Sequence, residues 1–433
     1  MHSKKHLSCT SLIASIRASF ETIHDPRAAN SSNTIADVML SGLACMYFQS
    51  PSLLDFQRRM ESGHHRNNLR SMFGVANIPT DNGMRNIIDQ VESETAFRPI
   101  FKDLFAKLQR GKHLEAYQIF PGKYLLNIDG TQYFSSQDIS CKKCLTRGTK
   151  KHQYNCHQVL QGAIVKHGLK QVIPVMPEEI CIQDGESKED CETNAFMRFV
   201  DKFRKDHDKL GVIYNGDALY ATTPVIDKIH ERQDNYIFRI KDDKHTTLVE
   251  NLKTIDKSKT YATSRRGNKV VIEWVNDVEI FKSTKVRSNY FEAREMVPQK
   301  DGKDKAQFLG KWITDIEVTS DNAKILLDSA RARWKIENEC FNTLKNHGYE
   351  MEHSYGHGVN LCYNFYNFIL LAFAMHQIHQ LTDILFKKLR SGFGSMSSLW
   401  NYLRVLTNTL YFNGIEALWI YLIEGDNYCP PPL

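Results

Sequence analysis

The chain has 433 residues, of which 42% are hydrophobic and 11% aromatic, enough for two or three domains with buried cores. Its 56 Lys and Arg residues against 50 Asp and Glu give a net charge of +6, which allows a polyanionic partner without requiring one. Ten cysteines without a signal peptide argue against a disulfide framework, and the apolar run 365–375 is too short to span a bilayer, so we expect a soluble, cytoplasmic protein with no membrane partner.

Residues 1–118 predict a helical domain, because apolar residues recur with helical spacing in five separate segments. These segments are 12–20, 35–48, 53–60, 84–91 and 97–108. The middle of the region is rich in arginine, at Arg58, Arg59, Arg66, Arg70 and Arg85. Short helices that carry arginines are typical of a DNA-binding module. An ordinary bundle with a solvated basic face is the alternative.

Residues 119–241 predict an α/β domain. The apolar segment 124–129 reads as a strand that ends in Asp129, and segment 210–217 reads as a strand that ends in Asp217. Between and after them lie further strands at 157–166, 170–176 and 236–240, and helices at 190–207 and 224–232. Three strands, a helix, a strand, a helix and a strand predict a mixed sheet covered by helices.

The remaining chain predicts an interruption of this domain and then its completion. Residues 242–320 alternate in the manner of strands and predict a β-rich insertion. Residues 321–385 return to the α/β domain with two helices, one around Glu337 and a strongly apolar one at 360–382. Residues 386–433 read as a C-terminal helical tail.

The helix around Glu337 is amphipathic. Trp334, Phe341 and Leu344 recur at the spacing of one helix face, with Arg333 one turn before Glu337. A carboxylate fixed on a core-packed helix beside cations suits a metal site that handles phosphate. A core helix with ion pairs one turn apart is the alternative.

Three carboxylates, Asp129, Asp217 and Glu337, therefore share one pattern: two end strands and the third lies on a later helix. Mg²⁺ prefers oxygen ligands and keeps several waters, so three carboxylates suffice to hold it. Two such ions about 4 Å apart can activate a water or a 3′-hydroxyl for displacement at a phosphodiester. We expect two Mg²⁺ or Mn²⁺ ions at these residues.

The run Arg333-Trp334-x-Ile336-Glu337, followed by Phe341, Leu344 and Lys345, resembles the glutamate helix of bacterial insertion-sequence transposases of the Asp-Asp-Glu type. The similarity covers about residues 120–380 and is best at 127–131, 190–192, 215–220 and 333–349. Ala330 stands where many relatives carry tyrosine, and Lys345 follows Glu337 by eight residues instead of seven. Glu339 is therefore an alternative to Glu337 as the catalytic glutamate.

The resemblance implies a ribonuclease-H-like core with a β insertion, and a Mg²⁺-dependent enzyme that cuts DNA at element ends and joins them to target DNA. Asp129, Asp217 and Glu337 would be the catalytic metal ligands, and Arg333 and Lys345 would contact DNA phosphate. The expected partners are double-stranded terminal inverted repeats and target DNA, bound by a homodimer in the bacterial nucleoid. A metal-dependent nuclease without joining activity and a non-catalytic DNA-binding derivative are the alternatives.

DNA contacts away from the carboxylates are assigned to Arg66, Arg70 and Arg85 in the N-terminal region and to Trp312 in the insertion. Relatives hold a flipped base with an aromatic residue of the insertion, and Trp312 is preferred to Trp274 for that role. Packing of both tryptophans in the core of the insertion is the alternative.

A second cluster of ligand-type residues comprises Cys141, Cys144, His152, Cys156 and His157, of which the first four are the preferred zinc set. A C-x-x-C pair with a later His and Cys can bind zinc tetrahedrally. The spacing is not that of a standard zinc finger, so free thiols are the preferred interpretation. The run Tyr355–Gly358 predicts a polar turn between two helices, with reach toward substrate as the alternative.

Overall fold

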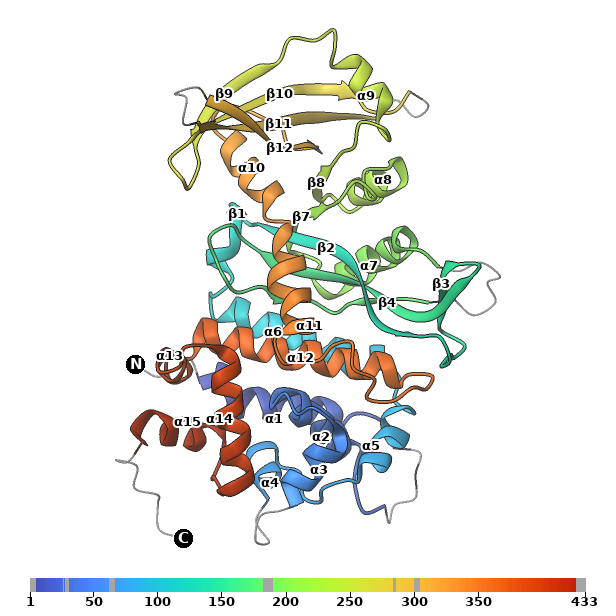
Figure 1. Ribbon diagram of the computed structural model, residues 1–433, viewed down its shortest axis with the longest axis vertical. Helices are drawn as coiled ribbons and strands as arrows, with labels where there is room; N and C mark the ends of the chain where they lie inside the picture. Colours follow the sequence, from blue (N-terminus) through green and yellow to red (C-terminus); the bar gives the residue numbers. More distant parts are fainter. Residues whose placement is uncertain are drawn as a thin grey trace.

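A mixed sheet runs from the middle of the molecule to one end, and a layer of helices covers the other end (Figure 1). The computed structural model describes residues 5–25, 27, 31–61, 67–181, 190–282, 286–299 and 304–425. Within these residues the chain is a mixed α/β protein with helices at its N-terminus, which confirms the predicted class at that level.

Twelve strands form the sheet, in the order β3-β4-β2-β7-β8-β12-β11-β10-β9, with β1 beside β2 and with β5 and β6 beside β4. Strands β2, β7 and β8 are parallel to one another, and the other neighbours are antiparallel. The strands are β1 (Gln118–Phe120), β2 (Lys123–Ser136), β3 (Leu145–Thr149), β4 (His152–Val165), β5 (Ile173–Pro174), β6 (Glu178–Ile180), β7 (Gly211–Gly216), β8 (Asn235–Arg239), β9 (Ser258–Thr263), β10 (Lys269–Glu279), β11 (Arg287–Pro298) and β12 (Asp304–Thr314).

The helices divide between the two ends of the chain and the connections of the sheet. The N-terminal helices are α1 (Cys9–Phe20), α2 (Ile35–Tyr47), α3 (Leu53–Glu61), α4 (Asn68–Phe73), α5 (Asp81–Ile88) and α6 (Ser93–Arg110). The connecting helices are α7 (Glu192–Asp206), α8 (Thr223–Glu231), α9 (Thr246–Asn251) and α10 (Ala323–Arg331). A π-helical segment (Ile336–Phe341) and α11 (Asn342–Asn346) follow, and the chain continues through α12 (Leu361–Thr382), α13 (Ile384–Ser391), α14 (Met396–Thr409) and α15 (Ile415–Glu424). Short 3-10 turns occupy Lys5–Leu7 and Glu115–Tyr117.

The predicted β-rich insertion continues the central sheet. Strand β12 pairs with β8 through Trp312–Arg239, Ile313–Phe238 and Thr314–Ile237, and β11, β10 and β9 follow outward. The last core strand therefore has a neighbour on both sides, with its backbone groups paired in the manner of an interior strand.

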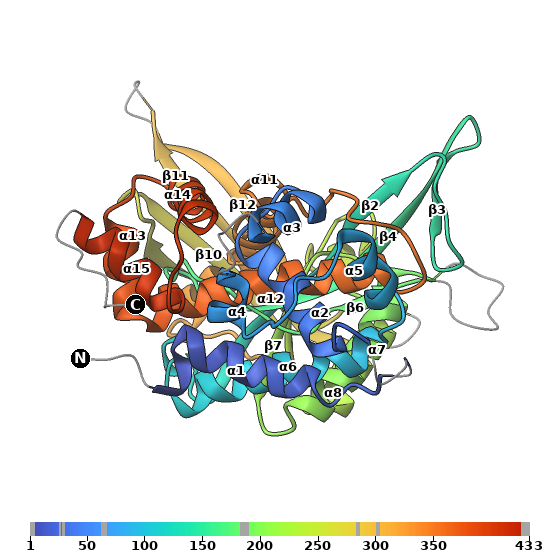
Figure 2. The same ribbon diagram turned by 90° about the horizontal axis from the view of Figure 1, so that it is seen from below.

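Helix α12 lies between the sheet and the N-terminal helices, and it is apolar on nearly every face (Figures 1 and 2). Such a helix is expected to be buried all round. Two of its polar side chains bond to the elements on either side. Asn364 donates to the carbonyls of Ile88 and Val91 at 2.7 and 2.8 Å, and Tyr366 donates to Gln161 of β4 at 3.0 Å.

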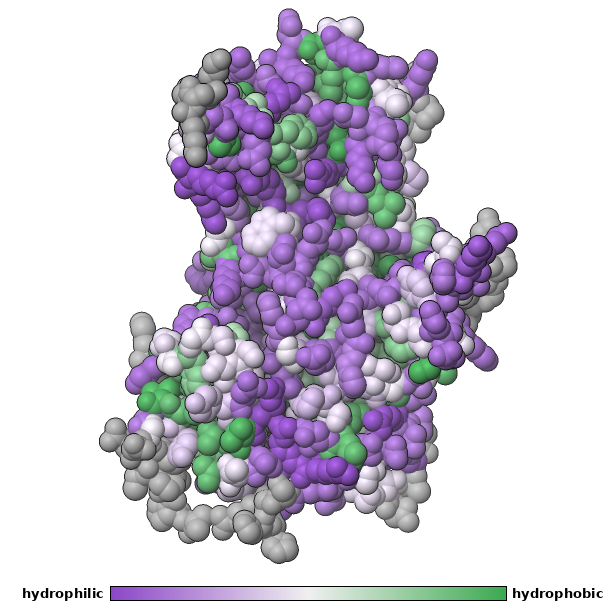
Figure 3. All heavy atoms as spheres, in the orientation of Figure 1, coloured by the Kyte–Doolittle hydropathy of each residue, from purple (hydrophilic) through white to green (hydrophobic). Residues whose placement is uncertain are grey.

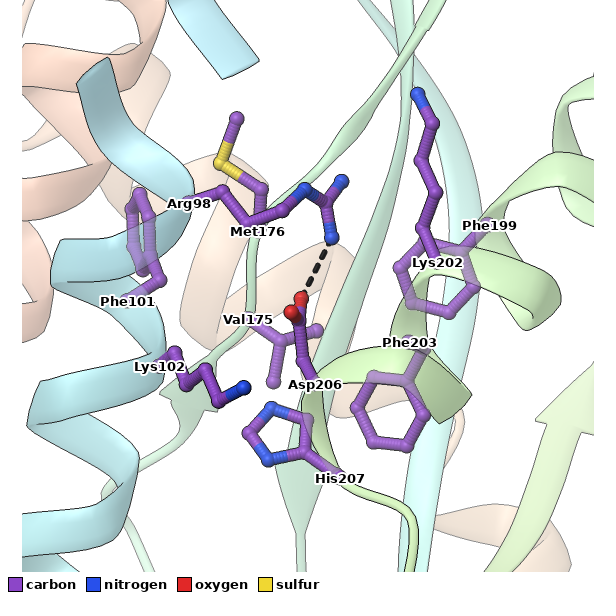
Figure 4. Close-up of a pocket in the computed structure, with 10 residues that line it drawn as sticks. All are labelled: Arg98, Phe101, Lys102, Val175, Met176, Phe199, Lys202, Phe203, Asp206 and His207. Carbon is purple, nitrogen blue, oxygen red and sulfur yellow. Dashed lines mark hydrogen bonds and ion pairs between the residues drawn. The ribbon is translucent and has the colours of Figure 1, made fainter. Parts of the chain in front are cut away.

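An ion pair between Arg98 of α6 and Asp206 of α7, at 2.6 Å, also joins the helical layer to the α/β region (Figure 4). Lys202 extends the network to Glu94 and Glu178, at 3.0 and 2.7 Å. The space that Arg98, Asp206 and their neighbours line is only ≈ 10 Å³, about the volume that one water molecule needs. This junction is a closed interface and no substrate site.

The C-terminal helices belong to the same layer as the N-terminal ones. Glu416 of α15 accepts hydrogen bonds from the backbone and hydroxyl of Thr10, at 3.1 and 2.6 Å. The Asn68 side chain donates to the carbonyls of Thr407 and Leu410. The sequence predicts a separate N-terminal domain and C-terminal tail, but in the structure the helices of these two regions pack together.

In the described part of the chain, no single helix has both the length and the apolar character to cross a membrane; α12 and α13 pass that test only as a pair, and they are bent by 92° relative to each other.

We expect an isolated fragment of residues 1–118 to lack a cooperative unfolding transition. All thirteen residues of α2 are buried in the full chain, where α2 packs against α12, so removing α12 exposes an apolar face. Urea unfolding followed by circular dichroism, with the full chain as control, tests this. A sharp transition in the fragment would show that α1–α6 fold independently.

Candidate active site

Asp129 and Asp217 lie at equivalent places on two adjacent parallel strands. The last paired residues of β2 and β7 are Asn127 and Asn215, and each aspartate follows two residues later. Neighbouring strands are about 4.8 Å apart, so the two carboxylates emerge at the same edge of the parallel sheet. Asp129 accepts a hydrogen bond from the Gly130 amide at 3.1 Å, and Asp217 accepts one from the Leu219 amide at 2.7 Å.

The two asparagines hold the chain before the glutamate against these strands. Asn215 donates to the Asn127 side-chain oxygen at 2.9 Å and to the Ser329 carbonyl at 3.0 Å. Asn127 donates to the Ala332 carbonyl at 2.7 Å. Both asparagines are fully buried, and the carbonyls that they bind lie at the end of α10, where each also accepts a backbone hydrogen bond of 3.0 Å. We call these two residues the asparagine clamp.

Glu337 lies in the π-helical segment, five residues after the last carbonyl that the clamp holds. The Asn342 amide bonds to the Glu337 carbonyl, which is the i to i+5 pattern of a π turn. Such turns are rare and occur often at functional sites. The local widening turns Glu337 to the edge of the sheet while Ile336, Cys340 and Leu344 stay fully buried.

Arg333 connects the glutamate with the first aspartate. Its guanidinium lies 2.6 Å from Glu337 and 3.3 Å from Asp129, measured between nitrogen and carboxylate oxygen. A single cation therefore bridges carboxylates that are 208 residues apart in the sequence, counted from 129 to 337. The arginine occupies the position in which positive charge is most strongly favoured.

The carboxylates outnumber this cation. Burial raises the pKa of Asp129 to about 7, against the lowering effect of Arg333, and Glu192, Glu337 and Asp217 raise it further. When the pKa of a carboxyl group is raised beside other carboxylates, there is too little positive charge nearby to stabilise its ionised form. The oxygen-only donor set and this shortage of positive charge both fit a divalent cation such as Mg²⁺ or Mn²⁺.

Glu192 is a fourth carboxylate that the sequence did not assign a role. It begins α7, accepts the Tyr220 hydroxyl, and has a pKa raised by burial. Gly130 makes room for it, because a Cβ there would lie 2.4 Å from the Glu192 carboxylate. The signal was present in the sequence: Glu192 falls in one of the four stretches that resemble the transposases, and Gly130 directly follows the first aspartate.

The structure separates the two candidate glutamates. Glu337 contacts Arg333 and raises the pKa of Asp129, so it belongs to the carboxylate site. Glu339 lines a different cavity of ≈ 690 Å³, together with Lys170 and Arg390. The alternative assignment of Glu339 is therefore not favoured by its position.

Two predicted DNA contacts are placed differently from the expectation. Trp312 is only 4% exposed and stacks on Phe291 with ring centres 5.4 Å apart, so it packs in the core of the β region and cannot hold a base. Lys345 is paired with Glu352 at 2.8 Å. In contrast, Trp334, expected on the buried helix face, is 41% exposed directly after Arg333.

The N-terminal arginines that were predicted to bind DNA lie in different environments. Arg66 lies outside the described residues. Arg70 is exposed at the end of α4, whereas Arg85 is engaged internally with Asp81 and the Tyr355 carbonyl. Arg58 and Arg59 line an open cavity of ≈ 520 Å³ with Arg404 of α14, a residue that the sequence reading did not single out.

The predicted zinc residues are only partly brought together. Cys141 and Cys144 lie beside each other, but their partners are His157 and His357, and not His152 and Cys156. His152 is exposed at the start of β4, and Cys156 faces away because neighbouring residues of a strand point to opposite sides. In the described residues this is the one place where three or more Cys, His, Asp or Glu ligand atoms converge within 4.8 Å, so the carboxylate site is more open than the Cys/His cluster.

A comparison with protein-family models finds no match for the chain, and a search of curated proteins finds none either. The residues and their geometry therefore carry the functional argument.

Replacing Asn127 by Ala should lower the free energy of unfolding by roughly 2–4 kcal/mol, because the Ala332 carbonyl and the Asn215 amide lose a buried partner. Urea unfolding of both proteins measures the change. Asn338→Ala, on the exposed side of the π-helical segment, is the matched control and should cost less than about 0.5 kcal/mol. Equal losses in the two variants would contradict the clamp.

Asp129 should make the metal-free protein less stable as the pH rises. Its folded-state pKa of about 7 lies above the ordinary value of 3.8, so its contribution is fully present below about pH 4 and is lost as the pH rises toward 7. In EDTA, the advantage of Asp129→Asn over wild type should therefore grow by roughly 2 kcal/mol between pH 5 and pH 8. Urea unfolding at both pH values measures it, with Asp256→Asn at an exposed position as control. An advantage that does not change with pH would refute the assignment.

Proposed function

We propose that the protein is a DNA transposase of the Asp-Asp-Glu type, which uses divalent cations to cleave phosphodiesters at element ends and to join them to target DNA. One observation carries the proposal: Asp129 and Asp217 each follow by two residues the point where β2 and β7 stop pairing in parallel, and the π-helical segment brings Glu337 next to Arg333, which also contacts Asp129. These are the three carboxylates of the sequence resemblance, and they come from three separate elements.

The arrangement of the central strands supports a ribonuclease-H-like core as the finer description of the fold. The chain runs through β2, β4 and the short β5 and β6, then through α7, β7, α8 and β8. The first strands are antiparallel, while β7 and β8 add to β2 in parallel, as expected for three strands, a helix, a strand, a helix and a strand. Asp129 lies on β2, and Asp217 directly follows β7.

The roles of the residues follow from their contacts. Asp129, Asp217 and Glu337 would hold the cations, with Glu192 close enough to influence Asp129. When bound, two such ions stabilise the charges of the attacking and leaving oxygens in an in-line displacement. The asparagine clamp keeps the carboxylates in position, so that little reorganisation is needed during the reaction.

Arg333 would exchange partners when the site is loaded. In the structure its guanidinium neutralises Asp129 and Glu337. Bound cations would take over that task, which leaves the guanidinium to donate to a phosphate oxygen of the scissile strand. The exposed Trp334 beside it offers an aromatic face to an unpaired base, the role first assigned to Trp312.

The surface around the site suits a nucleic-acid partner. The face that carries α10 and α11 is largely hydrophilic, and so is the surface over α3, whereas hydrophobic patches lie over α14 (Figure 3). Arg58, Arg59 and Arg404 share the open cavity between α3 and α14 with a single carboxylate, Asp55. Guanidinium groups at this density pair well with phosphates, and we assign this cavity to DNA outside the cleavage point.

We expect Asp129→Asn, Asp217→Asn and Glu337→Gln each to lower cleavage by at least about 100-fold, because each removes one cation ligand. The donor is a plasmid that carries the gene with its native flanking DNA, incubated with the full-length protein and Mg²⁺ or Mn²⁺. The products are mapped by sequencing, and strand transfer is scored in a marked target plasmid. Glu339→Gln is the matched control and should keep most of the activity.

The outcomes separate the rival functions. Cleavage without any joined product would identify a nuclease, and specific binding without cleavage would identify a non-catalytic DNA-binding protein. If Glu339→Gln is inactive while Glu337→Gln cleaves normally, the assignment of the catalytic glutamate is wrong.

A further inference from the structure

Four metal-binding side chains converge at a second place, and none of them is one of the carboxylates described above. Cys141 and Cys144 come from the loop between β2 and β3, His157 from β4, and His357 from the loop between α11 and α12. Their ligand atoms all lie within 4.8 Å of one another. Cys144 is buried, and His157 is only 1% exposed.

The spacing of these atoms is that of a tetrahedron around one zinc ion. Zinc–sulfur bonds of about 2.3 Å and zinc–nitrogen bonds of about 2.0–2.1 Å place two sulfurs about 3.8 Å apart and a sulfur and a nitrogen about 3.5 Å apart. The two sulfurs are 3.8 Å apart. His157 Nε2 lies 3.5 and 3.4 Å from the sulfurs of Cys141 and Cys144, and His357 Nε2 lies 3.7 Å from that of Cys144.

Hydrogen bonding alone does not account for this convergence. A thiol is a weak donor, and His157 Nε2 faces two sulfurs although it can accept only one hydrogen bond. The sulfurs are also far beyond the 2.05 Å of a disulfide. Four atoms that point at one centre are the arrangement that a cation produces, and a set of two sulfurs and two nitrogens in a tetrahedron is typical of zinc.

The surroundings of His157 match those of a metal-bound histidine. Among the described residues, its other nitrogen, Nδ1, is buried without a hydrogen-bond partner, and Glu179 Oε1, which also has none, lies 3.9 Å away. Metal-bound histidines commonly donate this second N–H to a carboxylate. A small approach of the two groups on metal binding would satisfy both. His357 has an equivalent partner, because its Nδ1 lies 3.2 Å from Cys362 Sγ.

The backbone of the C-x-x-C segment is shaped for the same purpose. The Cys141 amide points at Cys144 Sγ from 3.3 Å, and the Cys144 amide bonds to the Cys141 carbonyl at 3.1 Å. This tight turn directs both sulfurs to one side, and the amide helps to stabilise negative charge on a thiolate.

We propose that Cys141, Cys144, His157 and His357 bind one Zn²⁺ ion in a closed, structural site. Two thiolates balance the charge of the ion, and four protein ligands leave no position open for a substrate. The site does not depend on the proposed transposase activity.

The ion would connect two parts of the chain that contribute to the carboxylate site. Strand β2, which carries Asp129, leads into the C-x-x-C segment, and the π-helical segment with Glu337 leads into the loop of His357. Figure 1 shows that loop beside the outer end of the β2–β4 hairpin. Cys144 and His357 are 213 residues apart, so their connection closes a very long loop, which restricts the unfolded chain strongly.

The test begins with the metal content of the full-length protein, purified from medium that contains zinc and measured by inductively coupled plasma mass spectrometry. We expect about one zinc ion per chain, and less than about one fifth of that in Cys141→Ser and in His357→Asn. The matched controls are His152→Asn and Cys191→Ser, which change exposed residues of the same types and should keep the ion. Asp129→Asn should keep it as well, which separates this site from the carboxylates.

A second measurement covers variants that fail to fold. Wild-type protein stripped with a chelator and loaded with Co²⁺ should show the intense visible absorption of tetrahedral cobalt with thiolate ligands, and added Zn²⁺ should abolish it. Stripping should lower the melting temperature, and zinc should restore it. Wild-type protein that takes up neither ion, or a Cys141→Ser/His357→Asn double variant that retains a full zinc content, would overturn the proposal.

Discussion

The asparagine clamp is the interaction on which the geometry of the active site depends. Asn127 and Asn215 use their amides to bind the Ala332 and Ser329 carbonyls at the end of α10, each of which also accepts a hydrogen bond from a backbone amide three residues later. The strands thereby fix where the helix stops and where the π-helical segment begins. Because each asparagine precedes an aspartate by two residues, the same backbone that presents the carboxylates also positions the glutamate. A buried hydrogen-bond network of this kind is costly to disturb, which makes the spacing of the three carboxylates stiff.

Against this rigid frame, the charges of the site are unbalanced. Burial raises the pKa of Asp129 most, Arg333 lowers it, and Glu192, Glu337 and Asp217 raise it further. The fold therefore retains an arrangement that is unfavourable in the absence of a cation. Such an arrangement is understandable when binding a cation, and not stability, has been selected. Without a bound cation, Arg333 reduces the repulsion between the carboxylates. Its two partners, Asp129 and Glu337, are also proposed ligands of the cation.

The parts of the fold that follow from local pattern could be predicted, whereas those that depend on distant contacts could not. Apolar segments that end in Asp129 and Asp217 identify their strands, because burial on both faces leaves a plain signal. A regular helical period predicts that Trp334 lies on the buried face. That prediction is wrong because the turn at Ala332 and Arg333 and the π-helical segment interrupt the period. His357 and Arg404 each lie more than two hundred residues along the chain from the site residues that they join. A rule based on short sequence spacing therefore could not connect them.

The pairing of β12 with β8 has a consequence for how this protein can change over evolution. A domain joined by a linker can be lost or exchanged with little damage, but here the inserted strands supply the hydrogen-bond partners of a core strand. Deleting residues 242–320 would turn β8 into an exposed edge in the middle of the molecule, with unpaired backbone groups that invite aggregation. New strands can be added at the far side, beyond β9, where the sheet already ends. The insertion can therefore gain strands at its outer edge, but it cannot be removed without exposing β8.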